Sequence, residues 1–195
     1  MNLANKLTLS RICAVPVFIV CMELEGVLVS VLALIIFIAA SITDYFDGQI
    51  ARRNNMITPL GIFLDPLADK LLISAAFICF VDIRYLNIPA WMVVAIISRE
   101  FIITGLRSIA ASKNVIISAD KAGKFKTTSQ MVAIITILVI IIAHEGFMTY
   151  NNGAYSAIIL LLQKIPYWLT LAVTVLTIYS GFNYIWKHRK LFNEN

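Results

Sequence analysis

Several stretches of this chain are long, apolar and almost free of charge, and they restrict the folds open to it. Residues 27–43, for example, carry no charged side chain. A helix needs roughly 20 apolar residues to cross the hydrocarbon core of a bilayer. The composition agrees, because 14% of the residues are charged, whereas a soluble domain has about 25%. We therefore predict an all-α integral membrane protein that forms one domain over residues 1–195.

Six apolar stretches predict six transmembrane helices. Their approximate ranges are 11–22, 27–43 with a helical continuation to 53, 59–81, 88–106, 127–143 and 165–186. A helical stretch at the membrane surface, with the sequence NKLTLSR, is expected before the first span, and residues 146–164 are predicted to form a loop with a short interfacial segment. The N-terminal segment is expected to be retained, because no small-residue cleavage site follows it.

Basic residues fall almost entirely on one side of the predicted membrane. With six spans, twelve lysines and arginines lie on the side that carries both termini, and only Arg84 and Lys164 lie on the other. An excess of lysine and arginine marks cytoplasmic loops. We therefore predict a multi-pass protein of the cell membrane with both termini in the cytoplasm. Lys70 and Arg99 fall within spans and need a separate explanation.

Four aspartates interrupt the second and third spans near their cytoplasmic ends. Asp44 and Asp47 are three residues apart, so they share one face of a helix. Asp65 and Asp69 are four apart and share a face in the same way. Measured from the cytoplasmic ends of their helices, the first pair lies roughly 7.5–12 Å deep and the second roughly 9–15 Å deep. The two pairs can therefore converge between adjacent helices.

Carboxylates that converge in this way cannot all stay ionised unless cations lie close by. Lys70 and Arg52 are too few to balance them. Oxygen ligands favour Mg²⁺ or Mn²⁺, and two such ions close together are a common arrangement for phosphoryl chemistry. We therefore predict a site for two divalent ions, with the ligands Asp44, Asp47, Asp65 and Asp69.

Other interpretations of these aspartates are open from the sequence. Asp65 is suited to cap a helix that begins at Pro66, although that helix would be short for a span. Asp47 and Gly48 would suit a turn. The carboxylates could also line a proton or cation path in a transporter. Against the transporter, such a path needs neither the small residues of this region nor the Arg52 at its mouth.

The aspartates belong to a longer pattern. Residues 44–69 read D-x-x-D-G-x-x-A-R, then eight residues, then G-x-x-x-D-x-x-x-D. This pattern resembles the complete signature of the CDP-alcohol phosphatidyltransferases, a family with which the six spans and cytoplasmic termini agree. The resemblance implies transfer of a phosphatidyl group from CDP-diacylglycerol to an alcohol, with release of CMP. It also implies a homodimer among membrane lipids, with its active site facing the cytoplasm and no nucleic-acid partner.

The same resemblance implies roles for the residues of the signature. Two divalent ions, Mg²⁺ or Mn²⁺, would be held by Asp44, Asp47 and Asp65, with Asp69 partly shared. Asp69 would be the catalytic general base that takes the proton of the acceptor hydroxyl. CDP-diacylglycerol would be bound by Gly48, Ala51, Arg52 and Gly61.

Basic residues in the fourth and fifth spans predict the nature of the acceptor. Arg99 and Arg107 lie eight residues apart, close to one helix face, and the fifth span opens with GKFKTTSQM. Arginine forks suit a phosphate monoester. These segments resemble the phosphatidylglycerophosphate synthases within the family, whose acceptor is sn-glycerol 3-phosphate. The resemblance places the acceptor phosphate at Arg99, Arg107, Lys124 and Lys126, and less directly at Asn5, Thr8, Arg11 and Thr127.

Simpler explanations of these bases are open as well. Basic residues flank the spans of many membrane proteins, which suffices to explain Lys113 and Lys121. Arg99 stands beside Glu100 and could form an intramembrane ion pair with it. Within the family, inositol phosphate and serine are the alternative acceptors.

Overall fold

The computed structural model of the chain describes residues 3–53, 59–112, 121–150, 161–187 and 189. For residues 3–7, 44–53, 59–67, 69, 111, 112, 121, 122 and 124 the description covers the backbone alone. Six long α-helices and one short 3-10 helix occupy these ranges. In chain order they are α1 (Leu3–Glu23), α2 (Val27–Arg53), α3 (Pro59–Asp82), η1 (Arg84–Leu86), α4 (Ala90–Ser112), α5 (Lys121–Tyr150) and α7 (Ile165–Lys187).

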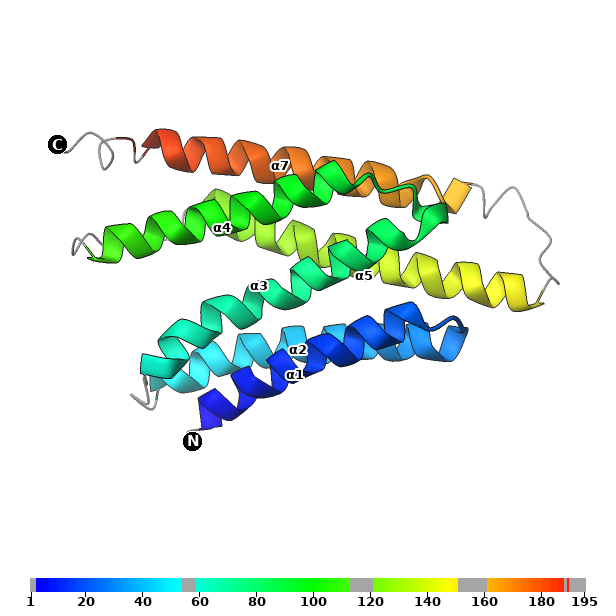
Figure 1. Ribbon diagram of the computed structural model, residues 1–195, viewed down its shortest axis with the longest axis horizontal. Coiled ribbons are helices and arrows are strands. Elements are labelled where there is room, and N and C mark those ends of the chain that lie inside the picture. Colours follow the sequence, from blue (N-terminus) through cyan, green and yellow to red (C-terminus); the bar gives the residue numbers. More distant parts are fainter. Residues whose placement is uncertain (1–2, 54–58, 113–120, 151–160, 188, 190–195) are drawn as a thin grey trace.

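Successive long helices run in opposite directions, so their ends gather at two ends of an elongated bundle (Figure 1). α1 begins and α7 ends at the same end of this bundle, where α2 ends, α3 begins and α4 ends (Figure 1). We call this the terminal end. The opposite end, which includes η1, the last turns of α5 and the first turns of α7, is called the far end (Figure 1).

The bundle consists of two groups of three helices. α1 packs against α2 and α3, whereas α7 packs against α4 and α5. The two groups are joined by contacts of α2 with α5 and of α3 with α4 and α5. α3 and α5 therefore form the centre of the bundle, because each makes its main contacts with three other long helices, whereas each of the others does so with two.

Aromatic and small side chains fill the interior. The rings of Phe18 and Phe37 join α1 to α2, with their centroids 6.2 Å apart. Small residues let membrane helices approach closely. Such residues are buried on α2, α3 and α5, and they include Ala33, Ala40, Ala76 and Ala133. The helices therefore pack through a combination of large rings and close backbone approach.

Large apolar side chains also cover the outside of the bundle. Leu28 is 85% exposed, and other exposed residues include Val94, Phe101, Val132, Trp168 and Phe182. Extensive exposed apolar surface marks contact with a membrane or a partner. Among the described residues, two helical stretches are long and apolar enough to cross a bilayer, Phe125–Tyr150 and Ile165–Lys187, and Val27–Thr43 is a shorter apolar helix. The all-helical fold class is confirmed, and the six-span topology stays a prediction.

Two helix boundaries decide between the local alternatives for the aspartates. α2 continues without a break to Arg53, so the alternative of a turn at Asp47 and Gly48 is wrong. α3 begins at Pro59, so the alternative in which Asp65 caps a helix is wrong as well. Both boundaries agree with the helical ranges predicted from the sequence.

The start of the loop predicted for residues 146–164 is wrong, whereas a short helical piece near its end is compatible with the interfacial segment predicted within it. α5 continues through Gly146 to Tyr150, and residues 161 and 162 are helical shortly before α7 begins. A glycine inside a helix costs only about 1 kcal/mol relative to alanine, so Gly146 does not have to end α5. A contact between α5 and α2 lies directly before it. Ser30 Oγ donates a hydrogen bond to Glu145 Oε2 at 2.7 Å. Residues 151–160 lie outside the described part of the chain.

A second polar contact joins η1 to α5 at the far end. The ring of Tyr85 stacks on His144, with centroids 3.8 Å apart and planes inclined by 15°. Burial, together with the nearby Glu145 carboxylate, raises the pKa of the Tyr85 hydroxyl above its usual range. With the bond between Ser30 and Glu145, this stack connects α2, η1 and α5.

We expect Ser30→Ala to lower the free energy of unfolding by roughly 0.6 kcal/mol, and by at most about 1.7 kcal/mol, which is the range for hydrogen bonds between membrane helices. The measurement is the thermal unfolding midpoint of the purified protein in detergent. Ser129→Ala is the matched control, because Ser129 Oγ donates to the Phe125 carbonyl within the same helix at 2.8 Å. Equal midpoints for the two variants would contradict the role assigned to the bond with Glu145.

Candidate functional site

The four aspartates lie on α2 and α3 at the terminal end of the bundle. Asp44 and Asp47 belong to the final turns of α2, and Asp65 and Asp69 to the first turns of α3. The end of α2 and the start of α3 lie together at the terminal end (Figure 1). Since both helices are unbroken there, each pair shares a helix face. The side chains of the signature lie outside the described residues, so the metal and nucleotide assignments stay predictions for Asp44, Asp47, Asp65, Asp69, Gly48, Ala51, Arg52 and Gly61.

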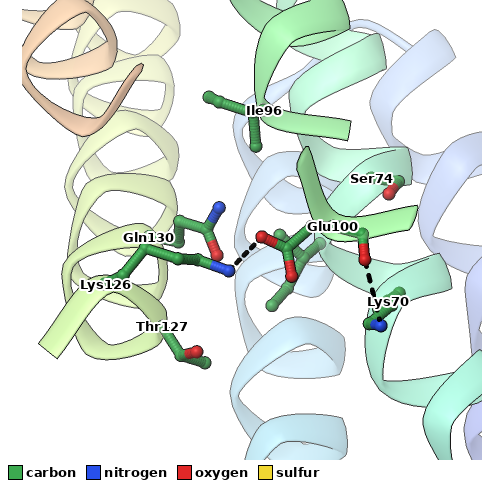
Figure 2. Close-up of a pocket in the computed structure, with 8 residues that line it drawn as sticks. Lys70, Ser74, Ile96, Glu100, Lys126, Thr127 and Gln130 are labelled. Atoms are coloured by element: carbon green, nitrogen blue, oxygen red, sulfur yellow. Dashed lines mark hydrogen bonds and ion pairs between the residues drawn. The ribbon is translucent and has the colours of Figure 1, made fainter. Parts of the chain in front are cut away.

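A cavity of ≈ 410 Å³ lies between α3, α4 and α5. Basic and hydroxyl side chains dominate its lining, which consists of Lys70, Arg99, Glu100, Ile103, Thr104, Arg107, Gly123, Lys126, Thr127 and Thr128. A smaller recess shares Lys70, Glu100, Lys126 and Thr127 with the cavity and adds Ile73, Ser74, Ile96 and Gln130 (Figure 2). The fold thus brings four residues of the predicted acceptor site together, namely Arg99, Arg107, Lys126 and Thr127.

Glu100 holds the lining of this cavity together. Its Oε1 accepts a hydrogen bond and ion pair from Lys126 Nζ of α5 (Figure 2). Arg99 Nη1 lies 3.5 Å from the same oxygen. On the other side, Lys70 Nζ of α3 donates to the backbone carbonyl of Glu100 at 3.4 Å (Figure 2). The ion pair between Arg99 and Glu100 therefore exists, and Arg99 lines the cavity at the same time.

The charge of the cavity is strongly positive. Its described lining holds four cationic side chains and one carboxylate, which leaves a formal charge of +3. These groups are shielded from solvent to different degrees: the side chain of Lys126 is 3% exposed and that of Arg99 12% exposed. Coulomb interactions are stronger in such a partly dry site than in water. The arrangement therefore favours an anion in the cavity.

Two residues around the cavity also carry buried donor atoms. Among the described residues, Arg99 Nε and the side-chain amide nitrogen of Gln130 have no hydrogen-bond partner. Most buried polar groups in proteins are hydrogen-bonded, and an unpaired one costs about 1–3 kcal/mol. Arg99 lines the cavity and Gln130 lines the adjoining recess.

α7 contributes hydroxyl groups behind the two arginines. Arg99 Nη2 donates to Ser180 Oγ at 2.9 Å. Arg107 Nε donates to the Tyr184 hydroxyl at 3.3 Å, and the guanidinium carbon lies 5.4 Å from the centre of the same ring. Each arginine is therefore fixed from outside the cavity by a neutral group that leaves its charge intact.

The other residues predicted for the acceptor site do not line this cavity, or their side chains are not among those described. Thr8 and Arg11 are buried on α1. Arg11 lines a different pocket, of ≈ 230 Å³, between α1 and α2. The side chains of Asn5 and Lys124 lie outside the described part of the chain. The acceptor assignments of these residues stay predictions.

Lys70, Ser180 and Tyr184 were not assigned to the acceptor site from the sequence. Lys70 could have been found, because it is a charged residue within an apolar span, and such residues are functional candidates by default. The signal in α7 is a row of hydroxyl residues at helical spacing, all of them buried: Thr170, Thr174, Thr177, Ser180 and Tyr184. Hydroxyls repeated every three or four residues lie on one face of a helix and indicate polar contacts with a neighbouring helix.

Comparison with known proteins gives a consistent result. Residues 1–179 match the family model of the CDP-alcohol phosphatidyltransferases. The CDP-diacylglycerol–glycerol-3-phosphate 3-phosphatidyltransferase of Bacillus subtilis (strain 168) is 37% identical, over 98% of this chain and 99% of its own. The protein of the same name from Rickettsia bellii is 35% identical over 93% of both chains. The cardiolipin synthase (CMP-forming) of Oryza sativa is 36% identical over 71% of this chain and 46% of its own. The chain belongs to the CDP-alcohol phosphatidyltransferase family.

Proposed function

We propose that this chain transfers the phosphatidyl group of CDP-diacylglycerol to sn-glycerol 3-phosphate, giving phosphatidylglycerophosphate and CMP. The observation that carries the choice of acceptor is the cavity whose described lining has a formal charge of +3. A phosphate monoester carries nearly two negative charges at neutral pH and offers several acceptor oxygens. Serine or unphosphorylated inositol would leave that charge unbalanced. The names of relatives from Bacillus subtilis and Rickettsia bellii point to the same acceptor.

Family members with other acceptors are the nearest alternative. The similarity to a rice cardiolipin synthase keeps a phospholipid acceptor in consideration. A phospholipid acceptor presents a phosphodiester, which has one negative charge and no terminal phosphate for two arginine forks to grip. Inositol phosphate would satisfy the charge as well as glycerol phosphate does, so direct competition between acceptors is needed to separate these two.

The aspartates of α2 and α3 form a donor set that fits two divalent ions. They offer oxygen ligands alone, which Mg²⁺ and Mn²⁺ prefer. Both helices bring their pairs to the same end of the bundle, which is a further requirement for a shared site (Figure 1). We assign Asp44, Asp47, Asp65 and Asp69 as ligands. When bound, the ions would polarise the diphosphate and stabilise the negative charge of departing CMP.

The residues of this chain then divide the reaction between them. Arg99, Arg107 and Lys126 hold the phosphate of the acceptor. Asp69, which directly precedes the cavity residue Lys70 on α3, takes the proton from the terminal hydroxyl of the acceptor. The hydroxyl oxygen forms a bond to the phosphatidyl phosphorus, and the bond from that phosphorus to the bridging oxygen of CMP breaks. CMP leaves with the electron pair.

The same proposal includes the membrane topology. We assign six spans with both termini in the cytoplasm and the cavity open to that side. The support is the excess of basic residues among the segments at the terminal end of the bundle. A homodimer in the cell membrane is part of the proposal through the family, and lipids are expected to cover the exposed apolar side chains.

The direct test of the proposed function is CMP release by the purified wild-type protein with CDP-diacylglycerol and Mg²⁺. The acceptors to compare are glycerol 3-phosphate, inositol 3-phosphate, inositol, serine and phosphatidylglycerol. We expect release with glycerol 3-phosphate. Release with a different acceptor alone would overturn the proposed acceptor, and no release with any acceptor from folded protein would favour the transporter alternative.

Asp69→Asn is expected to reduce kcat by roughly 10²–10⁴-fold, the usual contribution of a general base. The amide keeps the size of the side chain but cannot take the proton. Asp82→Asn is the matched control, because the same change is then made at the opposite end of α3. A kcat for Asp69→Asn equal to that of the control would remove Asp69 from the role of base.

Asp47→Ala is expected to abolish turnover at every Mg²⁺ concentration tested, because a metal ligand is lost. Removal of divalent ions from the wild-type protein with a chelator should give the same loss, and added Mg²⁺ or Mn²⁺ should reverse it. The measurement is CMP release as a function of metal concentration. Full activity of the variant, or of the chelated wild type, would contradict the metal site.

Arg107→Ala is expected to raise the KM for glycerol 3-phosphate by roughly tenfold to a hundredfold, the loss that follows from removing a charge-assisted hydrogen bond. The KM for CDP-diacylglycerol should change little. Arg84→Ala removes the same charge from η1 at the far end and serves as the control. A larger increase in the KM for CDP-diacylglycerol than in the KM for glycerol 3-phosphate would refute the acceptor assignment.

A further inference from the structure

One face of α7 contacts both arginines of the cavity from behind. The contacts come from three buried residues within about one helical turn, Ser180, Gly181 and Tyr184. α7 packs on α4 and α5, and none of the three residues lines the cavity itself. They therefore reach the cavity through Arg99 and Arg107 rather than by contact with its contents.

Arg99 is held at two points on this face. Ser180 Oγ accepts a hydrogen bond from Arg99 Nη2 at 2.9 Å. The aliphatic part of Arg99 lies directly on Gly181, where a Cβ would come within 2.8 Å of Arg99 Cγ and 3.4 Å of Arg99 Nε. Real Cβ atoms essentially never come that close to another heavy atom. Glycine at position 181 is therefore what allows Arg99 to take its observed path.

Arg107 is held by the next turn of the same face. The Tyr184 hydroxyl accepts a hydrogen bond from Arg107 Nε at 3.3 Å, and the guanidinium carbon lies 5.4 Å from the ring centre. Arg107 is exposed, whereas Tyr184 is buried, so the contact joins an exposed guanidinium to the packed interior of the bundle. A guanidinium has five N–H donors, and one contact to a hydroxyl leaves others available for an anion.

We infer that Ser180, Gly181 and Tyr184 are positioning residues that orient Arg99 and Arg107 for the phosphate of the acceptor and thereby set the preference for a phosphorylated alcohol. This inference rests on the proposed function. An unrestrained arginine side chain loses conformational entropy when it binds a ligand. If other residues already hold the side chain in its binding conformation, this loss is smaller. Hydroxyls suit this task because, unlike a carboxylate, they hold a guanidinium without neutralising it.

The simplest test is Tyr184→Phe, which removes the hydroxyl and keeps the ring. We expect the KM for glycerol 3-phosphate to rise roughly threefold to tenfold, which corresponds to one lost hydrogen bond. The KM for CDP-diacylglycerol and kcat should stay near the wild-type values. Ser180→Ala should give the same pattern through Arg99. A variant that merely loosened the packing of α7 would instead change the parameters of both substrates and the unfolding midpoint together.

Gly181→Ala is the second test and has a matched control in the same bundle. Gly105→Ala makes the same change on α4, where a Cβ meets nothing within 4 Å. We expect Gly181→Ala to raise the KM for glycerol 3-phosphate at least as much as Ser180→Ala, since it displaces the whole of Arg99. Gly105→Ala should behave as the wild type. Equal KM values for the two glycine variants would overturn the role of Gly181.

A double-mutant cycle shows whether Tyr184 affects acceptor binding through Arg107 or independently of it. If Tyr184 acts through Arg107, Tyr184→Phe should have no further effect on the KM in the Arg107→Ala background. Full additivity of the two changes would overturn the inference. Wild-type activity with glycerol 3-phosphate, together with unchanged KM values in all variants of α7, would overturn it while leaving the proposed function intact. No CMP release by the wild type would overturn the proposed function first.

Discussion

The carboxylate of Glu100 is the group on which the arrangement of the cavity depends. It pairs with Lys126 of α5 and lies beside Arg99 of α4, while the backbone carbonyl of the same residue accepts a hydrogen bond from Lys70 of α3. Cations removed from water cost several kcal/mol each unless they are paired. Through its carboxylate and its backbone carbonyl together, Glu100 contacts cations of three helices. Its single negative charge contacts Lys126 and Arg99. It is too little to neutralise them, and the surplus of positive charge is available to a ligand.

α7 also holds cations of the cavity, and it does so with neutral hydroxyl groups. Its outer face carries apolar side chains such as Trp168 and Phe182, which suit a lipid environment. Its inner face carries the buried row of hydroxyls that ends at Ser180 and Tyr184. A second carboxylate in this place would have lowered the formal charge of the described lining from +3 to +2. The hydroxyl groups restrict the conformations of the two arginines without neutralising the arginine charge. One face of α7 therefore suits contact with lipid, and the other face positions residues of the cavity.

The predictions that succeeded were those that depend on local sequence. The boundaries of α2 and α3 followed from apolar length and from the spacing of the signature, and they placed each aspartate pair on one helix face. The loop expected after residue 146 failed, because Gly146 and the polar residues near it resemble a break. α5 nevertheless continues to Tyr150, and Glu145 at this point contacts Ser30, 115 residues away in the chain. No local pattern contains such a contact.

The sequence by itself determined that this chain forms apolar helices, that four aspartates lie near one end of two of them, and that arginines lie within the fourth. These properties follow from residue type and spacing along a single helix. The tertiary structure decided that Arg99 pairs with Glu100 and still lines the cavity, that Lys70 joins it, and that Ser180 holds Arg99 from 81 residues away. The physical reason is that the rotation of each helix about its axis, and its distance from its neighbours, depend on how side chains fit between helices. Hydropathy and residue spacing along one helix do not specify that fit.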